Sequence, residues 1–185
     1  TCPVEVQRGV LISDNYGSGV FLANESGLQE LFSGRGAGRY WTLSPDRKFI
    51  GYKRILDDGL QVPELFEITS GSTRRLHSPV PLAGQVSFCA DGTAAFMVGT
   101  NLVVVRESGV VAFEIGTYSN IAPISPDGFR VAYSRNDGAV RIRDLMSGAE
   151  REVCARGDGH GFPVWSPDGT KLLYSDLAGN ALVFS

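Results

Sequence analysis

Hydrophobic and polar positions alternate along most of this chain, in short runs that are separated by turn residues. The runs at 129–134 and 172–175 are examples. Alternation with a period of two residues predicts β-strands that bury one face. More continuous apolar runs, at 102–105 and 182–184, predict strands that are covered on both faces. The pattern therefore predicts an all-β protein.

An apolar residue followed by Ser-Pro-Asp-Gly, or by a close variant, recurs four times. The gaps between successive aspartates are 45, 36 and 41 residues, close to the roughly 40–45 residues of four-stranded propeller blades. Two copies depart from the phrase, because Arg47 replaces Gly in one and Cys89-Ala90 replaces Ser-Pro in another. The aspartates are Asp46, Asp91, Asp127 and Asp168.

The chemistry of this phrase predicts a corner between two antiparallel strands. Pro fixes φ, the Asp carboxylate accepts hydrogen bonds from nearby amides, and Gly adopts a positive φ. The alternative, that the aspartates are metal ligands, is disfavoured because the repeated turns lie on separate blades and point away from one another. We therefore expect no metal site, and expect these residues to be structural: Asp46, Asp91, Asp127, Gly128, Asp168 and Gly169.

Ser-Gly pairs keep step with the corners and predict a second set of hairpin turns, so that each full unit contains strands A to D. In the fourth unit we expect strands at 121–124, 129–134, 140–145 and 151–154, and in the second unit at 40–43, 49–55, 64–68 and 73–76. Pro123 and Pro163 fall in strand A, which must then be a sheet edge. The pairs are Ser26-Gly27, Ser70-Gly71, Ser108-Gly109 and Ser147-Gly148.

The markers divide the chain into about five blade units that form one propeller domain or segment. The first unit begins at strand B, or at a degenerate strand A within 3–7, and the last stops at strand C. Closed propellers have about 4–8 complete blades, so we expect the chain to be part of a larger propeller. The alternative is a closed five-bladed ring in which residues 1–7 pair beside 181–184. The units cover approximately 1–36, 37–79, 80–116, 117–157 and 158–185.

The corner phrase and its flanking strands resemble the repeat of TolB-like and dipeptidyl-peptidase N-terminal propellers, called WD40-like or PD40 repeats. The resemblance covers most of the chain and implies a β-propeller of four-stranded antiparallel blades. It also implies a periplasmic or extracytoplasmic location. It leaves function open, because the same blade occurs in translocation-system proteins, peptidase gating domains, lyases and scaffolds.

Composition excludes several classes of partner. The net charge is −3 with both signs interspersed, so no basic stripe indicates nucleic acid. No run approaches the roughly 20 apolar residues of a membrane span, and we expect no membrane insertion. Cys89 and Cys154 are expected to be buried thiols on inner and outer strands, and Cys2 lies near the terminus.

The sequence contains no recognisable catalytic set and predicts no cofactor. His77 and His160 form no metal-spaced cluster with cysteine or with each other. A Gly-x-Ser-x-Gly nucleophile elbow is missing from the 185 residues. The glycines of 34–39 lack the spacing of a dinucleotide-binding loop, so this segment is expected to be a connection between blades.

The D-to-A connections and B-to-C loops emerge at the blade end opposite the aspartate corners, and in propellers they surround the mouth of the central channel. We expect them to form a non-catalytic platform for a protein or peptide. The alternative is the substrate-gating propeller of a prolyl-oligopeptidase-like (S9-type) serine peptidase whose catalytic domain lies outside this chain. A lyase or glycosidase ranks last, because strand A offers mainly Trp, Val, Ala and Pro. The candidate binding residues are Arg35, Arg39, Asn120, Arg135, Asp137, Asp158 and His160.

Overall fold

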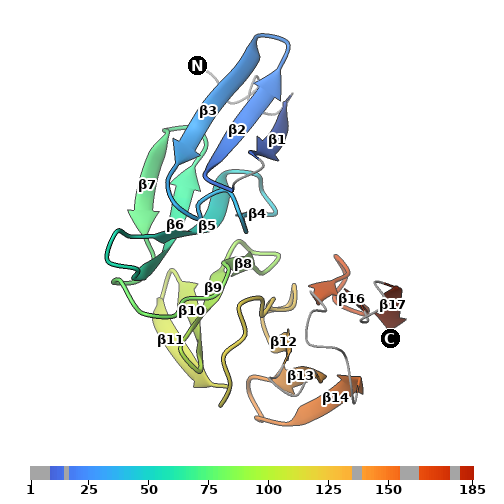
Figure 1. Ribbon diagram of the computed structural model, residues 1–185. Coiled ribbons are helices and arrows are strands. Elements are labelled where there is room, and N and C mark those ends of the chain that lie inside the picture. The colour runs from blue at the N-terminus through green and yellow to red at the C-terminus, as the bar shows by residue number, and fades with distance from the viewer. Residues whose placement is uncertain (1–8, 15–16, 135–138, 155–162, 176–179) are drawn as a thin grey trace. The chain divides into compact units, whose positions relative to one another are not determined.

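The computed structural model describes residues 9–14, 17–134, 139–154, 163–175 and 180–185 (Figure 1). Within these ranges every regular element is a β-strand, and every strand pairing is antiparallel. This confirms the prediction of an all-β fold. The chain divides into two compact units, residues 1–86 and 87–185, which are described separately.

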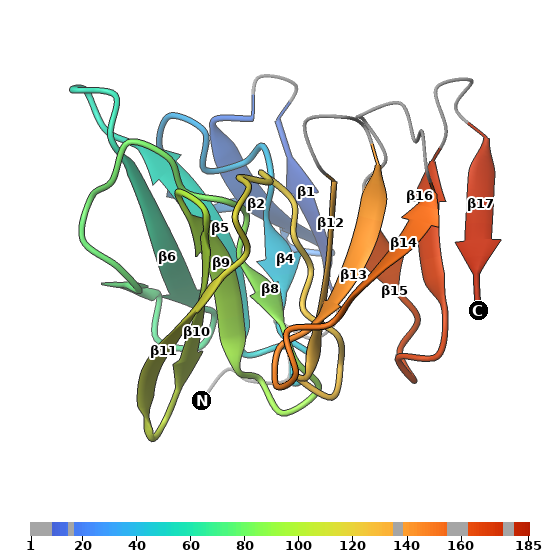
Figure 2. The same cartoon turned by 90° about the horizontal axis from the view of Figure 1, so that it is seen from below.

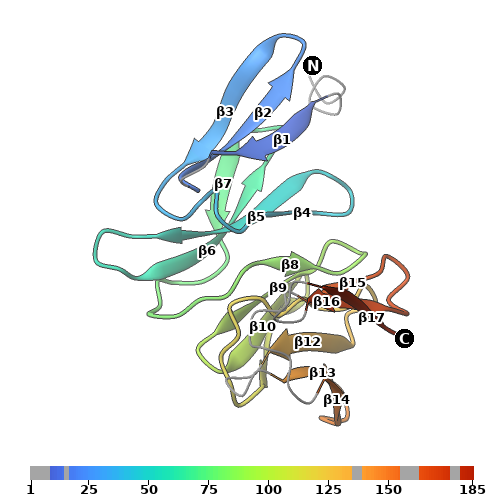
Figure 3. The same ribbon diagram turned by 45° about the vertical axis from the view of Figure 1, so that its right-hand side comes forward.

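The first compact unit contains two sheets (Figure 3). Their side chains share one apolar core. Ile50 and Tyr52 alternate along one face of the second sheet and pack with Val20 of the first. The ring of Phe32 stacks on Tyr52 with centroids 4.2 Å apart, a contact that adds to area burial. The sheets have the orders β1(Val10–Ser13), β2(Gly19–Asn24), β3(Gly27–Ser33) and β4(Thr42–Leu43), β5(Phe49–Ile55), β6(Gln61–Glu67), β7(Ser72–Arg75).

The second compact unit contains three sheets among its described residues (Figure 2). The first of these has the order β11(Gly109–Glu114), β10(Asn101–Arg106), β9(Ala94–Val98), β8(Ser87–Phe88). The next has the order β12(Arg130–Ser134), β13(Val140–Asp144), β14(Glu150–Cys154), and the last has the order β15(Val164–Trp165), β16(Leu172–Ser175), β17(Ala181–Phe184).

Strand β12 shows why these sheets stack. Val131 and Tyr133 face a core that includes Met97 of β9, while Ala132 faces a second core that includes Leu172 of β16. Both faces of the β12 sheet are therefore buried, as in a propeller blade between two neighbours. Each buried aliphatic side chain contributes about 1.5–3 kcal/mol relative to an exposed one.

The predicted strand at 121–124 is reduced to one isolated bridge, Ile124 with Val131. Pro123 explains the reduction, because it has no N–H to donate. Its carbonyl still accepts the Ala132 N–H at 3.0 Å, so the segment keeps its edge position. The Ser-Gly pairs lie at the turns that join β2 to β3, β6 to β7, β10 to β11 and β13 to β14, and Gly27 and Gly109 are the first residues of β3 and β11.

Candidate functional site

The aspartate corners are closed networks of hydrogen bonds. Ser166 donates to Asp168 at 2.5 Å and accepts the Lys171 N–H at 2.9 Å, while Asp168 accepts the Thr170 N–H at 3.0 Å. The corners at 44–49 and 125–130 repeat all three bonds. Hydrogen bonds from Ser166 and Thr170 lower the pKa of Asp168 to about 2. These carboxylates are engaged with their own turns.

The left-handed corner position explains the glycine in the phrase. Gly92, Gly128 and Gly169 have φ values of 86°, 77° and 69°, which glycine adopts without a steric penalty. Arg47 holds the same position with φ 59°, a strained conformation for a residue with a Cβ. At the second corner Cys89 replaces the serine, although Asp91 still accepts the Thr93 N–H at 2.9 Å.

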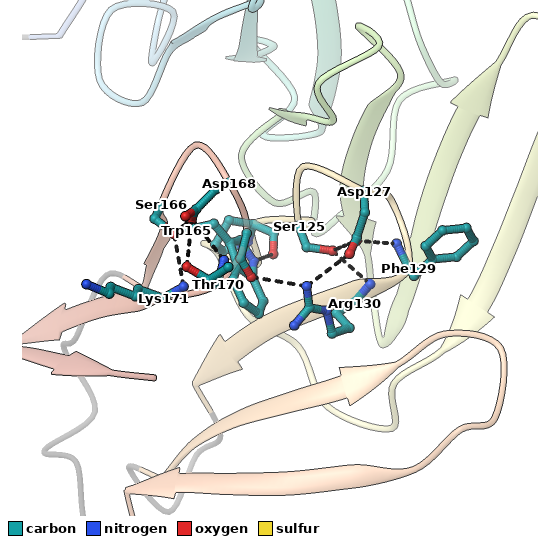
Figure 4. A network of polar contacts seen from close by, with 11 residues as sticks. Ser125, Asp127, Phe129, Arg130, Trp165, Ser166, Asp168, Thr170 and Lys171 are labelled. Carbon is teal, nitrogen blue, oxygen red and sulfur yellow. Dashed lines mark hydrogen bonds and ion pairs between the residues drawn. The ribbon is translucent and has the colours of Figure 1, made fainter.

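Arg130 joins two neighbouring corners (Figure 4). Its Nη2 donates to Asp127 Oδ2 at 2.9 Å and to the Gly169 carbonyl at 3.1 Å. The guanidinium lies 5.0 Å from the centroid of the Trp165 ring, and the Trp165 indole donates to the Pro123 carbonyl at 3.0 Å. Such cation–π contacts contribute about 0.5–1 kcal/mol at exposed sites. At the corner end of these two sheets, the contacts of Arg130 therefore hold neighbouring blades together.

The opposite end of the first compact unit contains the predicted D-to-A connection at 34–39. The Gly34 N–H donates to the Ser18 carbonyl at 2.7 Å and the Gly38 N–H donates to the Gly17 carbonyl at 3.0 Å. A Cβ on Gly38 would lie 2.3 Å from the Gly19 carbonyl oxygen, so only glycine allows this approach. On its other side the connection accepts the Ile55 N–H at 2.8 Å, through the Arg35 carbonyl.

This backbone arrangement holds Arg35 and Arg39 in one short connection with both side chains exposed. Asp14 orders the neighbouring turn, since it accepts the Ser18 N–H at 2.7 Å and the Ser18 hydroxyl. The hydrogen bonds from Ser18 lower the pKa of Asp14, so it is a carboxylate at neutral pH. The connection is a preformed surface that presents two guanidinium groups.

Two further arginines lie at this end and were not predicted from the sequence. Glu64 on β6 is fully buried, and its Oε1 lies 2.6 Å from Arg54 Nη2 and 3.7 Å from Arg75 Nε. Residue 54 is on β5 and residue 75 on β7, so the carboxylate sits between the two guanidinium groups on adjacent strands. Sequence reasoning missed this triad because it depends on the cross-strand register.

A buried lysine lies on the same strand as Arg54. Lys53 is 8% exposed, and its Nζ donates to the Ala83 carbonyl at 2.7 Å. Burial lowers the pKa of Lys53 to about 8. Gln61 fixes the same segment from β6, because its Oε1 accepts the Ala83 N–H at 3.0 Å. Lys53 therefore holds the 80–86 segment against the second sheet.

The remaining candidate binding residues lie either in the second compact unit or outside the described residues. Asn120 belongs to the second compact unit, where its Oδ1 accepts the Tyr118 hydroxyl at 3.2 Å. The structure therefore groups Arg35 with Arg39 but does not place them relative to Asn120. Four candidates lie outside the described residues: Arg135, Asp137, Asp158 and His160. Of the described cysteines, Cys89 is buried and Cys154 is half-buried, and both are free.

Two local findings bear on membrane and metal chemistry. No helix among the described residues is long and apolar enough to cross a membrane. Across those same ranges, no group of three or more His, Cys, Asp or Glu side chains could hold a metal ion.

Comparisons with solved structures show what the fold resembles. TolB from Acinetobacter baumannii is similar to 96% of this chain, with a TM-score of 0.75 and 15% identity, and the chain spans about half (49%) of its length. The Cps50 (Swd1) β-propeller domain from Myceliophteria thermophila is similar to 83% of this chain, which covers 53% of that domain, with a TM-score of 0.62 and 13% identity. A tricorn protease is similar to 90% of the chain with a TM-score of 0.61 and 15% identity, over 18% of the protease.

No family model matches the sequence, and neither does any curated protein. The likenesses to solved structures are therefore likenesses of fold. Together with the antiparallel sheets buried on both faces and the repeated corners, they show that this chain has a β-propeller fold similar to that of TolB and of the Cps50 (Swd1) domain.

Proposed function

We propose that this chain is a non-catalytic platform that binds a protein or peptide through its D-to-A and B-to-C loops. The observation that carries the proposal is the clamped 34–39 connection, which presents Arg35 and Arg39 at the surface on a backbone held from both sides. Loops on a rigid β scaffold are common binding sites. The propeller fold supplies that scaffold.

The clamped backbone supports binding for a physical reason. Ordering a loop upon association lowers affinity, and a loop that is already ordered avoids this loss. Arginine is also among the residues that contribute most to protein interfaces. Asn120, Arg135, Asp137, Asp158 and His160 remain in the proposal as candidate residues of the other D-to-A and B-to-C loops.

The test is a selection of peptides from a random displayed library on the wild-type protein, followed by affinity measurements on variants. The double variant Arg35→Glu/Arg39→Glu should weaken the selected peptides at least tenfold without lowering the melting temperature. A matched charge reversal, Arg106→Glu/Lys171→Glu, lies at the hairpin and corner end of the blades and should leave affinity unchanged. Equal affinity for both double variants would exclude the 34–39 connection from the binding face.

A second candidate function is favoured by the likeness to the tricorn protease. On this alternative the chain is the propeller of an S9-type serine peptidase and restricts substrate access to a catalytic domain. The test is to read the gene downstream of Ser185. A Gly-x-Ser-x-Gly elbow followed by an Asp and a His within a few hundred residues would favour the gating role over the platform.

A further inference from the structure

The Glu64 triad consists of Arg54, Arg75 and the buried carboxylate of Glu64. It lies at the proposed binding end of the first compact unit. Glu64 lies directly opposite Arg75 in the register of β6 and β7, and opposite Tyr52 in the register of β5 and β6. Tyr52 and Arg54 are two residues apart on β5 and so share one face of the sheet. The register therefore places both arginines on the face that carries Glu64.

Both guanidinium groups are partly exposed, and Glu64 accepts a hydrogen bond from Arg54 and forms a longer ion pair with Arg75. The Glu64 side chain is 0% exposed, whereas those of Arg54 and Arg75 are 35% and 56% exposed. A carboxylate removed from water makes a strong charge-assisted hydrogen bond at short distance, and the Arg54 contact at 2.6 Å is of that kind. Glu64 thus restrains Arg54 by a short hydrogen bond and attracts Arg75 over a longer distance, while part of each arginine side chain faces solvent.

The triad is continuous with the 34–39 connection. A Cβ built on Gly34 would lie 3.0 Å from Arg54 Cδ, and the Arg35 carbonyl accepts the N–H of Ile55, the residue after Arg54. Three arginines, at positions 35, 54 and 75, therefore accompany a single buried carboxylate. Counted over Arg35, Arg54, Arg75 and Glu64 alone, these side chains carry an excess of two positive charges.

Among the described residues, the acidic side chains of the neighbouring turns form no ion pair with Arg35, Arg54 or Arg75. Asp14 accepts hydrogen bonds from Ser18. Asp58 accepts the Leu60 N–H at 3.0 Å within the turn between β5 and β6, and Asp57 precedes it. The exposed parts of Arg54 and Arg75 are therefore available to an acidic ligand from outside.

Resting on the proposed platform function, we propose that this arginine surface, formed by Arg35, Arg54 and Arg75, binds an acidic peptide segment through Asp or Glu side chains. Guanidinium groups pair with carboxylates by two parallel hydrogen bonds when their planes are held in place. Glu64 supplies that restraint and so acts as a positioning residue. Because of this restraint, the arginine surface should distinguish ligands by the geometry of their acidic side chains as well as by their charge.

The experiment uses three labelled decapeptides of Gly and Ser that contain two glutamates, two glutamines or two phosphoserines. Their binding to the full chain is measured by fluorescence anisotropy. The glutamate peptide should bind at least tenfold more tightly than the glutamine peptide. Equal binding of the two, or binding of the phosphoserine peptide alone, would overturn the assignment to a carboxylate-bearing segment.

Variants separate positioning from charge. Glu64→Gln makes the surface more positive by one charge, so simple attraction would strengthen binding of the glutamate peptide, whereas loss of positioning should weaken it at least fivefold. Arg54→Lys retains the charge and should also weaken binding at least fivefold, which keeps the test decisive if the Gln variant folds poorly. Arg74→Lys, at the residue before Arg75 on β7, is the matched control, and this variant should bind the glutamate peptide as tightly as the wild type does.

The outcomes also distinguish this proposal from the platform function. If library-selected peptides bind in a manner that depends on Arg35 and Arg39 but do not prefer acidic residues, the platform stands and the acidic partner is wrong. Tighter binding of the glutamate peptide to Glu64→Gln would refute the positioning role of Glu64.

Discussion

Replacing Lys53 by Met should change how the free energy of unfolding of this protein depends on pH. In the folded chain Lys53 is 8% exposed, and burial lowers its pKa to about 8 from an ordinary value of 10.5. Between these two values the unfolded state binds more protons than the folded state. The free energy of unfolding must therefore rise with pH across this window and fall as the pH drops through 8.

The magnitude follows from the size of the pKa difference. Each pKa unit corresponds to 1.36 kcal/mol, so a difference of about 2.5 units corresponds to about 3 kcal/mol. Below pH 8 Lys53 is protonated in both states and its contribution is constant. The wild type should therefore gain up to about 3 kcal/mol relative to Lys53→Met between pH 7.5 and 10.5.

The assay is urea unfolding at several pH values, followed by tryptophan fluorescence, with Trp41 in the same compact unit as Lys53. Burial raises the pKa of Cys89 to about 12, so its titration opposes that of Lys53 in the wild type, and the difference between the proteins is the quantity to compare. Lys48→Met is the control, because the Lys48 side chain is 66% exposed. Parallel curves for the wild type and Lys53→Met would refute the reasoning.

Three further predictions concern the corners. Arg47→Gly should raise the free energy of unfolding by about 0.5–1 kcal/mol, because it relieves a left-handed backbone at φ 59°; an unchanged melting temperature would contradict it. Ser125→Ala should lower the free energy of unfolding, measured by urea unfolding, by about 1–3 kcal/mol, because it removes the buried hydroxyl that accepts the Arg130 N–H. Asp168→Asn should lower the melting temperature at neutral pH but progressively less from pH 4 to 2, because the Asp168 pKa of about 2 lies below its unfolded value and its stabilisation is lost as pH falls; a pH-independent difference would exclude this.

The corners and the strands around them were predictable because their chemistry is local. Pro, Asp and Gly at fixed offsets specify the turn, and alternation specifies which face of each strand is buried. The propeller fold followed from the spacing of these signals, and the structural likenesses confirm it. The strand at 121–124 was predicted too long, because one proline removes the N–H that a ladder needs.

The arginine surface was only partly predictable. Arg35 and Arg39 were placed in a connection by the glycines around them. The Glu64 triad depends instead on which residues of β5, β6 and β7 lie opposite one another, and this register is set by hairpin geometry that charge patterns do not reveal. The clamp between Gly17 and Gly38 joins segments that are distant in sequence, so no local signal predicts it.

The residue in the middle of strand B, the strand that follows each aspartate corner, has a consequence for the engineering of blades. Four to six residues after the corner aspartates, the chain reads Ile-Gly-Tyr at 50–52, Ala-Phe-Met at 95–97, Val-Ala-Tyr at 131–133 and Leu-Leu-Tyr at 172–174. The central side chain thus ranges from none to a phenyl ring, although the flanking pattern recurs. The central residue is buried in three of these strands, at Gly51, Phe96 and Ala132, whereas Leu173 is 44% exposed. Blades that share the same corner are therefore not exchangeable modules, and a duplicated or transplanted blade would leave a cavity or a clash unless its central residue were redesigned as well.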